Sequence, residues 1–219
     1  MSSFVLYNYF RSSTSFRARV TLELKGIPYE YKAINLLKDE QHSPEYRKIN
    51  PMGGLPTLIH EGKIIPDSMA IVEYLEEIQP SPSIMPKDAY LRARVRQVCE
   101  IVNASMHPYG NLKITKYMGE VHGYTQDQKD QWAQKWIIQG LEALEKTLPE
   151  FAGKYCFGDE VTMADIVLYP QIITCQRFKV DLSKYPTVMK IFANLDQHPK
   201  FKKAHFSRQI DTPEDLRQP

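Results

Sequence analysis

Apolar and polar residues follow two different periods along the chain, and the change separates its first part from the remainder. Up to residue 80, short runs of β-branched and aromatic residues alternate with helix-like stretches. The pattern predicts strands at residues 4–9, 29–35, 57–60 and 63–65, and helices at residues 15–25, 44–49 and 68–78. Glu61-Gly62 fits a two-residue hairpin turn between the last two strands. The order β-α-β-α-β-β-α predicts a small mixed sheet with helices on its faces.

A Pro/Ser-rich stretch at residues 79–86 reads as a linker, and beyond it the pattern contains no convincing strand. Helical spacing predicts helices at residues 89–106, 125–148, 162–175, 186–196 and 199–204. Thr162 and Asp165 have the spacing of a capping box, which gives Asp165 a structural role. We therefore expect an α/β domain at residues 1–80, a linker at 81–87 and an all-α domain at 88–219.

Composition and charge exclude several classes of protein. The 219 residues are 42% hydrophobic and 25% charged, which is typical of a globular protein. The net charge of +2 is spread through the chain, so we expect no nucleic-acid partner. We also expect no membrane partner, because no apolar run approaches the length of a transmembrane helix.

Cysteine and histidine usage indicates compartment and metal content. The three cysteines are widely spaced and include no C-x-x-C pair, which favours reduced thiols over disulfides. Cys99 and Cys175 read as core thiols. The N-terminal residues lack the pattern of a secretory signal, so we expect a cytoplasmic protein. The six histidines are scattered, and we expect no metal site.

The first candidate site is the turn at residues 9–17, with the sequence YFRSSTSFR, between the first strand and the first helix. Ser12, Ser13 and Thr14 place hydroxyl groups beside the backbone N–H groups of a helix N-terminus. That end of a helix carries a partial positive charge. The turn is therefore suited to holding an anion or a thiolate.

Two further positions are suited to binding an extended, charged ligand. Leu55-Pro56 precedes a strand, and a cis bond there would turn the Leu55 backbone outward to pair with a peptide. The alternative is an ordinary turn with a trans bond. Asp67-Ser68 opens the third helix. It can serve as a plain N-cap, or the same helix end can bind a carboxylate.

Four motifs together resemble the zeta class of the glutathione transferases. They are residues 9–19 (YFRSSTSFRAR), 50–58 (NPMGGLPTL), 157–165 (FGDEVTMAD) and 177–182 (RFKVDL). The resemblance spans essentially the whole chain. It implies a thioredoxin-like N-terminal domain, an all-α C-terminal domain, glutathione as cofactor and a homodimer.

The resemblance also implies roles for individual residues. Ser12 would activate the glutathione thiol, and Arg11 and Arg177 would complete the catalytic set by holding substrate carboxylates. The positions expected to bind glutathione or line its site are Ser12, Ser13, Thr14, His42, Leu55, Pro56, Asp67, Ser68, His107, Asn111, Leu112 and Lys113.

Some of these positions have competing interpretations. Tyr7 lies where other transferase classes place a catalytic tyrosine, but packing within the sheet is favoured because the serines are present. Pro108 follows His107, so this histidine either ends a helical turn or faces the pocket. Arg17 and Arg19 read as structural or solvated helix charges.

The implied reaction is the glutathione-dependent cis–trans isomerisation of maleylacetoacetate to fumarylacetoacetate, in tyrosine and phenylalanine catabolism. Thr14 departs from the family motif, which has cysteine there, and bacterial maleylpyruvate isomerases resemble this chain at Thr14 and at His107-Pro108. Maleylpyruvate is therefore a second possible diketo-acid substrate. The same fold would also suit a transferase acting on small halogenated acids, or a non-catalytic binding or scaffold protein.

Overall fold

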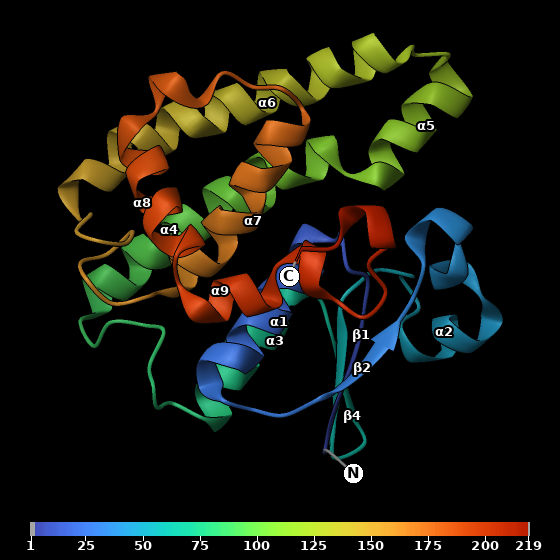
Figure 1. Cartoon of the computed structure of the whole chain (residues 1–219), viewed down its shortest axis with the longest axis horizontal. Coiled ribbons are helices and arrows are strands. Elements are labelled where there is room, and N and C mark those ends of the chain that lie inside the picture. The colour runs from blue at the N-terminus through green and yellow to red at the C-terminus, as the bar shows by residue number, and fades with distance from the viewer. Residues whose placement is uncertain (1–2, 219) are drawn as a thin grey trace. The chain divides into compact units, whose positions relative to one another are not determined.

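The structure is a computed structural model that describes residues 3–218. The chain divides into two compact units, drawn in Figure 1. The first unit runs to Ser83 and also includes the segment from Gln197 onward, and the second unit is Ile84–Asp196. The division between Ser83 and Ile84 falls inside the linker predicted from the sequence.

A four-stranded mixed sheet forms the centre of the first unit. Its strands are β1 (Phe4–Asn8), β2 (Glu30–Ala33), β3 (Thr57–His60) and β4 (Lys63–Pro66), in the order β2-β1-β3-β4. Strand β1 is parallel to β2 and antiparallel to β3, and β3 and β4 form the predicted hairpin. Glu61 and Gly62 both have positive φ, 51° and 76°, as the favoured two-residue hairpin turn requires.

The predicted helices of the first unit are α1 (Ser13–Lys25), α2 (Pro44–Ile49) and α3 (Ser68–Ile78). Helices α1 and α3 pack side by side, and α2 lies on the other side of the sheet (Figure 1). Leu22 and Leu75, on α1 and α3, are fully buried against Leu6 and Leu58 of the sheet. Burying such a side chain contributes about 1.5–3 kcal/mol, so this apolar contact fixes α1 on the sheet.

The C-terminal segment corrects the predicted domain boundaries. We predicted that residues 88–219 form one helical domain, but residues from Gln197 onward pack with the first unit. Helix α9 (Pro199–Ala204) lies along α1, and its buried Phe201 ring is 5.9 Å from that of Phe16. Arg19 of α1 is fully buried and donates to the Ala204 carbonyl oxygen, 3.2 Å away. The C-terminal segment therefore provides a hydrogen-bond acceptor for Arg19 and an apolar contact for Phe16, both on α1.

The second unit is helical, as predicted. Its α-helices are α4 (Ala89–Ser105), α5 (Leu112–His122), α6 (Gln126–Thr147), α7 (Met163–Arg177) and α8 (Pro186–Asp196). Helix α5 was not predicted from the sequence. Met118 is buried, whereas Tyr117 and Val121 of the same helix are more than half exposed, so its apolar pattern does not mark one buried face.

Short 3₁₀ helices connect these elements. They are η1 (Leu36–Lys38), η2 (Glu40–His42), η3 (His107–Gly110), η4 (Leu148–Glu150), η5 (Leu182–Lys184), η6 (Phe206–Arg208) and η7 (Glu214–Leu216). Two of them, η2 and η3, carry residues predicted to line the site. Within residues 3–218, no helix combines the length and hydropathy needed to cross a bilayer.

Buried polar groups confirm two structural predictions in the second unit. The Asp165 carboxylate accepts hydrogen bonds from the Thr162 backbone N–H at 2.7 Å, the Thr162 hydroxyl at 2.9 Å and the Cys156 N–H at 2.8 Å. It therefore caps α7. Cys99 and Cys175 are buried free thiols, and burial raises the pKa of Cys175 to about 12. Both thiols are core side chains, and the Cys175 thiol is neutral.

Candidate functional site

The Ser12 hydroxyl lies at the N-terminus of α1. Ser12 is the N-cap of this helix, and its Oγ accepts a hydrogen bond from the Ser15 N–H at 3.1 Å. The same Oγ is 2.9 Å from Thr14 Oγ1, and Thr14 donates to the Leu55 carbonyl oxygen at 2.9 Å. Ser13 is the first residue of the helix. The structure thus joins Ser12, Thr14 and Leu55, three predicted site residues, in one hydrogen-bonded chain.

The direction of this chain follows from donor chemistry. A carbonyl oxygen only accepts, so the single hydroxyl proton of Thr14 is directed at Leu55. The contact between Thr14 and Ser12 is then a hydrogen bond donated by Ser12. If the Thr14 hydroxyl turned toward Ser12, the direction would reverse and the Ser12 proton would be available to another acceptor. The pair is able to switch its direction of donation.

The loop after Leu55 connects this turn to the start of α3. The Leu55–Pro56 bond is cis, as the sequence suggested. The Pro56 carbonyl oxygen accepts from the Asp67 N–H at 3.2 Å. The buried Ser68 hydroxyl accepts from Arg17 Nη1 at 3.2 Å. Leu55, Pro56, Asp67 and Ser68 therefore lie along one continuous stretch of the first unit.

The N-cap prediction for Asp67 is wrong in one respect. Asp67 occupies the N-cap position of α3, but its carboxylate makes no capping hydrogen bond. Its backbone has φ 68° and ψ 130°, a conformation that is costly for a residue other than glycine. The side chain is exposed, so the carboxylate is presented outward at the helix end instead of being used to cap it.

His42 at the end of η2 is oriented by a residue that the sequence analysis did not select. Its Nδ1 is 3.1 Å from Nη2 of Arg47. Because a guanidinium can only donate, Nδ1 accepts and the proton of the neutral ring is on Nε2. Gly53 has φ +63°, and a Cβ there would lie 3.0 Å from Nδ1 of His42. The loop therefore closes on the ring; the only sequence signal was the Gly53-Gly54 pair.

The arginines near the turn have different environments. Arg11 is exposed. Arg17 and Arg19 are fully buried, so the interpretation of them as solvated charges is wrong and the structural one is right. Tyr7 of β1 lies against Tyr46 of α2, with ring centroids 5.7 Å apart.

In the second unit, the predicted residues gather where η3 meets α5. Asn111 is the N-cap of α5, and its Oδ1 accepts from the Lys113 N–H at 3.0 Å. Nδ2 of Asn111 is 3.4 Å from Nε2 of His107. Leu112 and Lys113 are exposed on the first turn of α5. His107 thus begins a 3₁₀ turn and is in contact with a side chain of the predicted set.

Arg177, the last residue of α7, belongs to the same part of the second unit. Its guanidinium carbon is 4.9 Å from the centroid of the Phe178 ring. The Phe178 ring lies against Gly110, where a Cβ would be 3.0 Å from Cε2 of Phe178. Phe178 therefore fixes the end of α7 against η3. The predicted residues form two sets, one in each unit.

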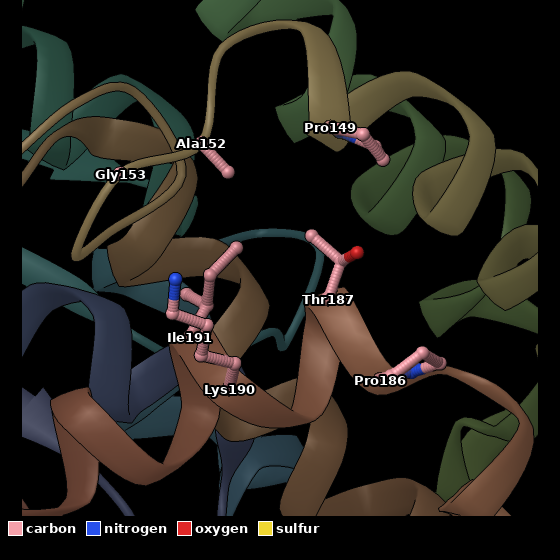
Figure 2. A pocket seen from close by; sticks show the side chains of 7 residues that line it. All are labelled: Pro149, Ala152, Gly153, Pro186, Thr187, Lys190 and Ile191. Carbon is pink, nitrogen blue, oxygen red and sulfur yellow. The ribbon is translucent and has the colours of Figure 1, made fainter.

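A cavity of about 330 Å³ in the second unit is lined by none of these predicted residues (Figure 2). It is lined by Pro149, Ala152, Gly153, Pro186, Thr187, Lys190 and Ile191. The start of α8 lies beside it, but the Glu145 carboxylate already accepts from the Thr187 and Val188 N–H groups, at 2.9 and 3.1 Å. Those donors are not available to a ligand. Among residues 3–218, no group of three His, Cys, Asp or Glu side chains could hold a metal ion.

Comparison with known proteins gives matches over nearly the whole chain. Residues 2–77 match the glutathione S-transferase N-terminal domain, and residues 113–207 match the C-terminal domain. The chain is 47% identical to the maleylacetoacetate isomerase of Mus musculus, over 97% of both chains. It is 43% identical to a zeta-class glutathione S-transferase of Euphorbia esula, over 94% of this chain and 92% of the relative.

Solved structures give the same result. A bacterial zeta-class maleylpyruvate isomerase superposes with a TM-score of 0.93 at 37% identity, covering 95% of this chain and all of that one. The maleylacetoacetate isomerase of Anaeromyxobacter dehalogenans, solved with glutathione in its active site, has a TM-score of 0.86 at 39% identity. That match covers 96% of this chain and 98% of the other.

Proposed function

This chain belongs to the glutathione transferase family, and we propose that it converts maleylacetoacetate to fumarylacetoacetate with glutathione as a recycled cofactor. The observation that carries the proposal is the full-length similarity to maleylacetoacetate isomerases, at 47% identity to the mouse enzyme and 44% to that of Dictyostelium discoideum. The hydrogen-bonded chain from Ser12 to Leu55 supports it, because it provides a site for a thiolate beside a site for a peptide backbone.

The reaction is nucleophilic catalysis by a thiolate that the cofactor supplies. The glutathione sulfur adds to one carbon of the cis double bond, and the electron pair of that bond moves into the neighbouring carbonyl to form an enolate. Rotation then occurs about the resulting single bond. When the enolate collapses, the C–S bond breaks, the trans double bond forms and the thiolate is regenerated. No atom is gained or lost.

Ser12 would stabilise the thiolate. A cysteine-like thiol has a pKa of about 8.5, and lowering it by two units takes about 2.7 kcal/mol. The N-terminus of α1 supplies only about 0.3–1 kcal/mol at an exposed site. A hydrogen bond to a charged group supplies about 1.5–3 kcal/mol. The hydroxyl is therefore required, and the helix alone is not sufficient.

The other residues of the first unit would hold the tripeptide. The Leu55 backbone would pair with it, and Ser68 at the start of α3 would receive one of its carboxylates. The exposed Asp67 carboxylate is complementary to the glutathione ammonium group. His42, which presents an N–H at Nε2, would donate a hydrogen bond to the second glutathione carboxylate.

Residues of the second unit would take part in substrate binding. We propose this role for Asn111, Leu112, Lys113 and His107, and propose that Arg177 and Arg11 each bind a substrate carboxylate. Guanidinium groups bind carboxylates in a bidentate manner. The same cations would stabilise the negative charge of the enolate.

We further propose a homodimer that works in the cytoplasm as part of aromatic amino-acid breakdown. Light scattering of the purified protein tests the dimer. A fully active monomer would contradict it.

A second candidate reaction is the isomerisation of maleylpyruvate, which is favoured by Thr14 and by the similarity to a zeta-class maleylpyruvate isomerase. The deciding experiment measures kcat/KM for both diketo acids, with and without glutathione. We expect glutathione-dependent turnover with maleylacetoacetate as the better substrate. A preference for maleylpyruvate would assign the second reaction. Turnover only with a small halogenated acid would indicate a transferase, and no turnover would indicate a binding protein.

A further inference from the structure

The turn that carries Ser12 is held from behind by a buried arginine. Nη1 of Arg19 donates to the Tyr9 carbonyl oxygen at 3.2 Å, and Nη2 donates to the Phe10 carbonyl oxygen at 3.0 Å. Its Nε donates to Ala204 at 3.2 Å, at the end of α9. The Ser12 N–H also donates to the Tyr9 carbonyl oxygen, at 3.1 Å. One guanidinium thus links the turn to the C-terminal segment.

A carboxylate from the same segment also holds the turn, by accepting a hydrogen bond from one of its backbone N–H groups. Oδ2 of Asp211 accepts from the Phe10 N–H at 3.0 Å, although the two residues are 201 positions apart in the chain. Oδ1 accepts a hydrogen bond from the Tyr31 hydroxyl, on strand β2. Both oxygens are used, so the carboxylate is fixed in orientation. Tyr31 in turn is fixed, because it pairs with Leu6 in the sheet.

These contacts fix the backbone of Tyr9 and Phe10, which immediately precede Arg11 and Ser12. Both carbonyl groups of Tyr9 and Phe10 are bonded to Arg19, and the Phe10 N–H is bonded to Asp211. Burial lowers the pKa of Arg19, and the opposite charge of Asp211 is one of the contributions that oppose this shift. Loss of Asp211 would leave the Phe10 N–H without its acceptor and the Arg19 charge less compensated.

We propose that Asp211 is a positioning residue for the reaction, which acts through Phe10 to hold the Ser12 hydroxyl at the distance and angle that stabilise the glutathione thiolate. The inference rests on the proposed role of Ser12. A displacement of about 1 Å at such a site is enough to lower a rate by orders of magnitude. Asp211 itself need not contact either glutathione or the diketo acid.

The test compares Asp211→Ala with Asp211→Asn in the full-length protein. The readouts are the pKa of bound glutathione, titrated by the ultraviolet absorbance of its thiolate, and kcat for the isomerisation. We expect Asp211→Ala to raise the thiol pKa by about one unit and to lower kcat about tenfold at pH values below the thiol pKa, where one pKa unit is a tenfold change in the ionised fraction. Asparagine keeps an acceptor for the Phe10 N–H, so Asp211→Asn should stay within about threefold of the parent.

Matched controls separate positioning from loss of stability. Asp215→Ala removes an exposed carboxylate from the same segment and should leave both readouts unchanged. If Asp211→Ala does not fold, Tyr31→Phe replaces it, because this change removes only the bond that orients the carboxylate. A smaller rise in the thiol pKa is expected for that variant.

Three results would overturn the inference. They are an unchanged thiol pKa in Asp211→Ala despite a lower melting temperature, a failure of Asp211→Asn to restore the parent values, and an unchanged thiol pKa in Tyr31→Phe if that variant replaces Asp211→Ala. The thiol titration uses glutathione alone. A parent protein that lowers the thiol pKa but isomerises neither diketo acid would therefore contradict the proposed reaction without deciding the role of Asp211.

Discussion

The hydroxyl oxygens of Thr14 and Ser12 lie 2.9 Å apart, and the Thr14 hydroxyl donates a hydrogen bond to the Leu55 carbonyl oxygen at 2.9 Å. The residue that replaces the cysteine of the family motif is thus bonded to the residue proposed to stabilise the thiolate. If Ser12 donates to a thiolate, the Thr14 hydroxyl can turn from Leu55 and donate to Ser12 instead. Successive hydrogen bonds of this kind strengthen one another.

Thr14→Val tests this coupling, because it keeps the shape of the side chain and removes the hydroxyl. We expect the pKa of bound glutathione to rise by about half a unit, with an approximately threefold fall in kcat at pH values below the thiol pKa. Thr14→Ser keeps the hydroxyl and is the matched control. If both variants behave like the parent, Thr14 has no part in activating the thiol.

Ser12→Ala should abolish most turnover and leave glutathione binding largely intact. The hydroxyl stabilises the thiolate in this mechanism, whereas Leu55 and Ser68 hold the peptide. A loss of about 1.5–3 kcal/mol of transition-state stabilisation corresponds to a fall in kcat of roughly ten- to a hundredfold. Steady-state kinetics and calorimetric titration with glutathione measure the two effects separately.

Because Ser12 also caps α1, its loss should cost about 1 kcal/mol of stability as well. Asp88→Ala removes the N-cap of α4, where the carboxylate accepts from Leu91 at 2.9 Å, and so gives a comparable loss without touching the site. Activity should persist in that control. The assignment to Ser12 fails if Tyr7→Phe is far more damaging than Ser12→Ala.

Arg177→Ala should change substrate selectivity. Losing a charge-assisted contact of about 1.5–3 kcal/mol lowers kcat/KM for a diacid by roughly ten- to a hundredfold. Conjugation of glutathione to an uncharged aromatic electrophile should scarcely change. The measurement is kcat/KM for the isomerisation and for the conjugation, both made with the same enzyme preparation.

Lys184→Ala is the matched control for Arg177→Ala, since Lys184 is an exposed cation of the same unit. It should affect neither reaction. Equal losses on both substrates in Arg177→Ala, together with a lower melting temperature, would show that Arg177 is structural.

Cys175 predicts a specific dependence of stability on pH. Its folded-state pKa of about 12 is above the ordinary value of 9.0, so the folded protein holds the proton that the unfolded chain releases. The stability that the neutral thiol contributes is complete below about pH 9 and is lost as pH rises toward 12. At pH 10 the loss amounts to about 1.4 kcal/mol.

Denaturant unfolding of the parent and of Cys175→Ala at pH 7 and pH 10 measures this effect. The difference in free energy of unfolding between the two proteins should shrink by about 1.4 kcal/mol at the higher pH. Val188→Ala removes a buried side chain that does not titrate, and its difference from the parent should be the same at both pH values. A constant difference for Cys175→Ala would show that this thiol ionises normally in the folded protein.

Local signals predicted most elements of the fold. Pro44 and the Ser43 cap defined α2, and Glu61-Gly62 defined the hairpin, because each acts over a few residues. The motif around Ser12 likewise placed a hydroxyl at a helix N-terminus. These features need no knowledge of the distant chain.

The contacts that support the site could not be predicted in this way. Asp211 approaches Phe10 only after the chain has folded, and nothing near either residue indicates the other. The sequence left open whether Arg19 is structural or solvated, because three of its four acceptors are backbone carbonyls, which any sequence provides. Arg47 was missed because its contact with His42 depends on the orientation of the His42 ring.

The return of the C-terminal segment limits how this protein can be recombined. A chimera joined within the linker would combine the turn of one relative with the Asp211 and Ala204 positions of another. The turn would then be held by residues that come from a different parent protein, even though the junction itself lies in the linker. Domain exchange in this family should therefore use two junctions, near Ser83 and Gln197, so that the inserted helical unit moves alone.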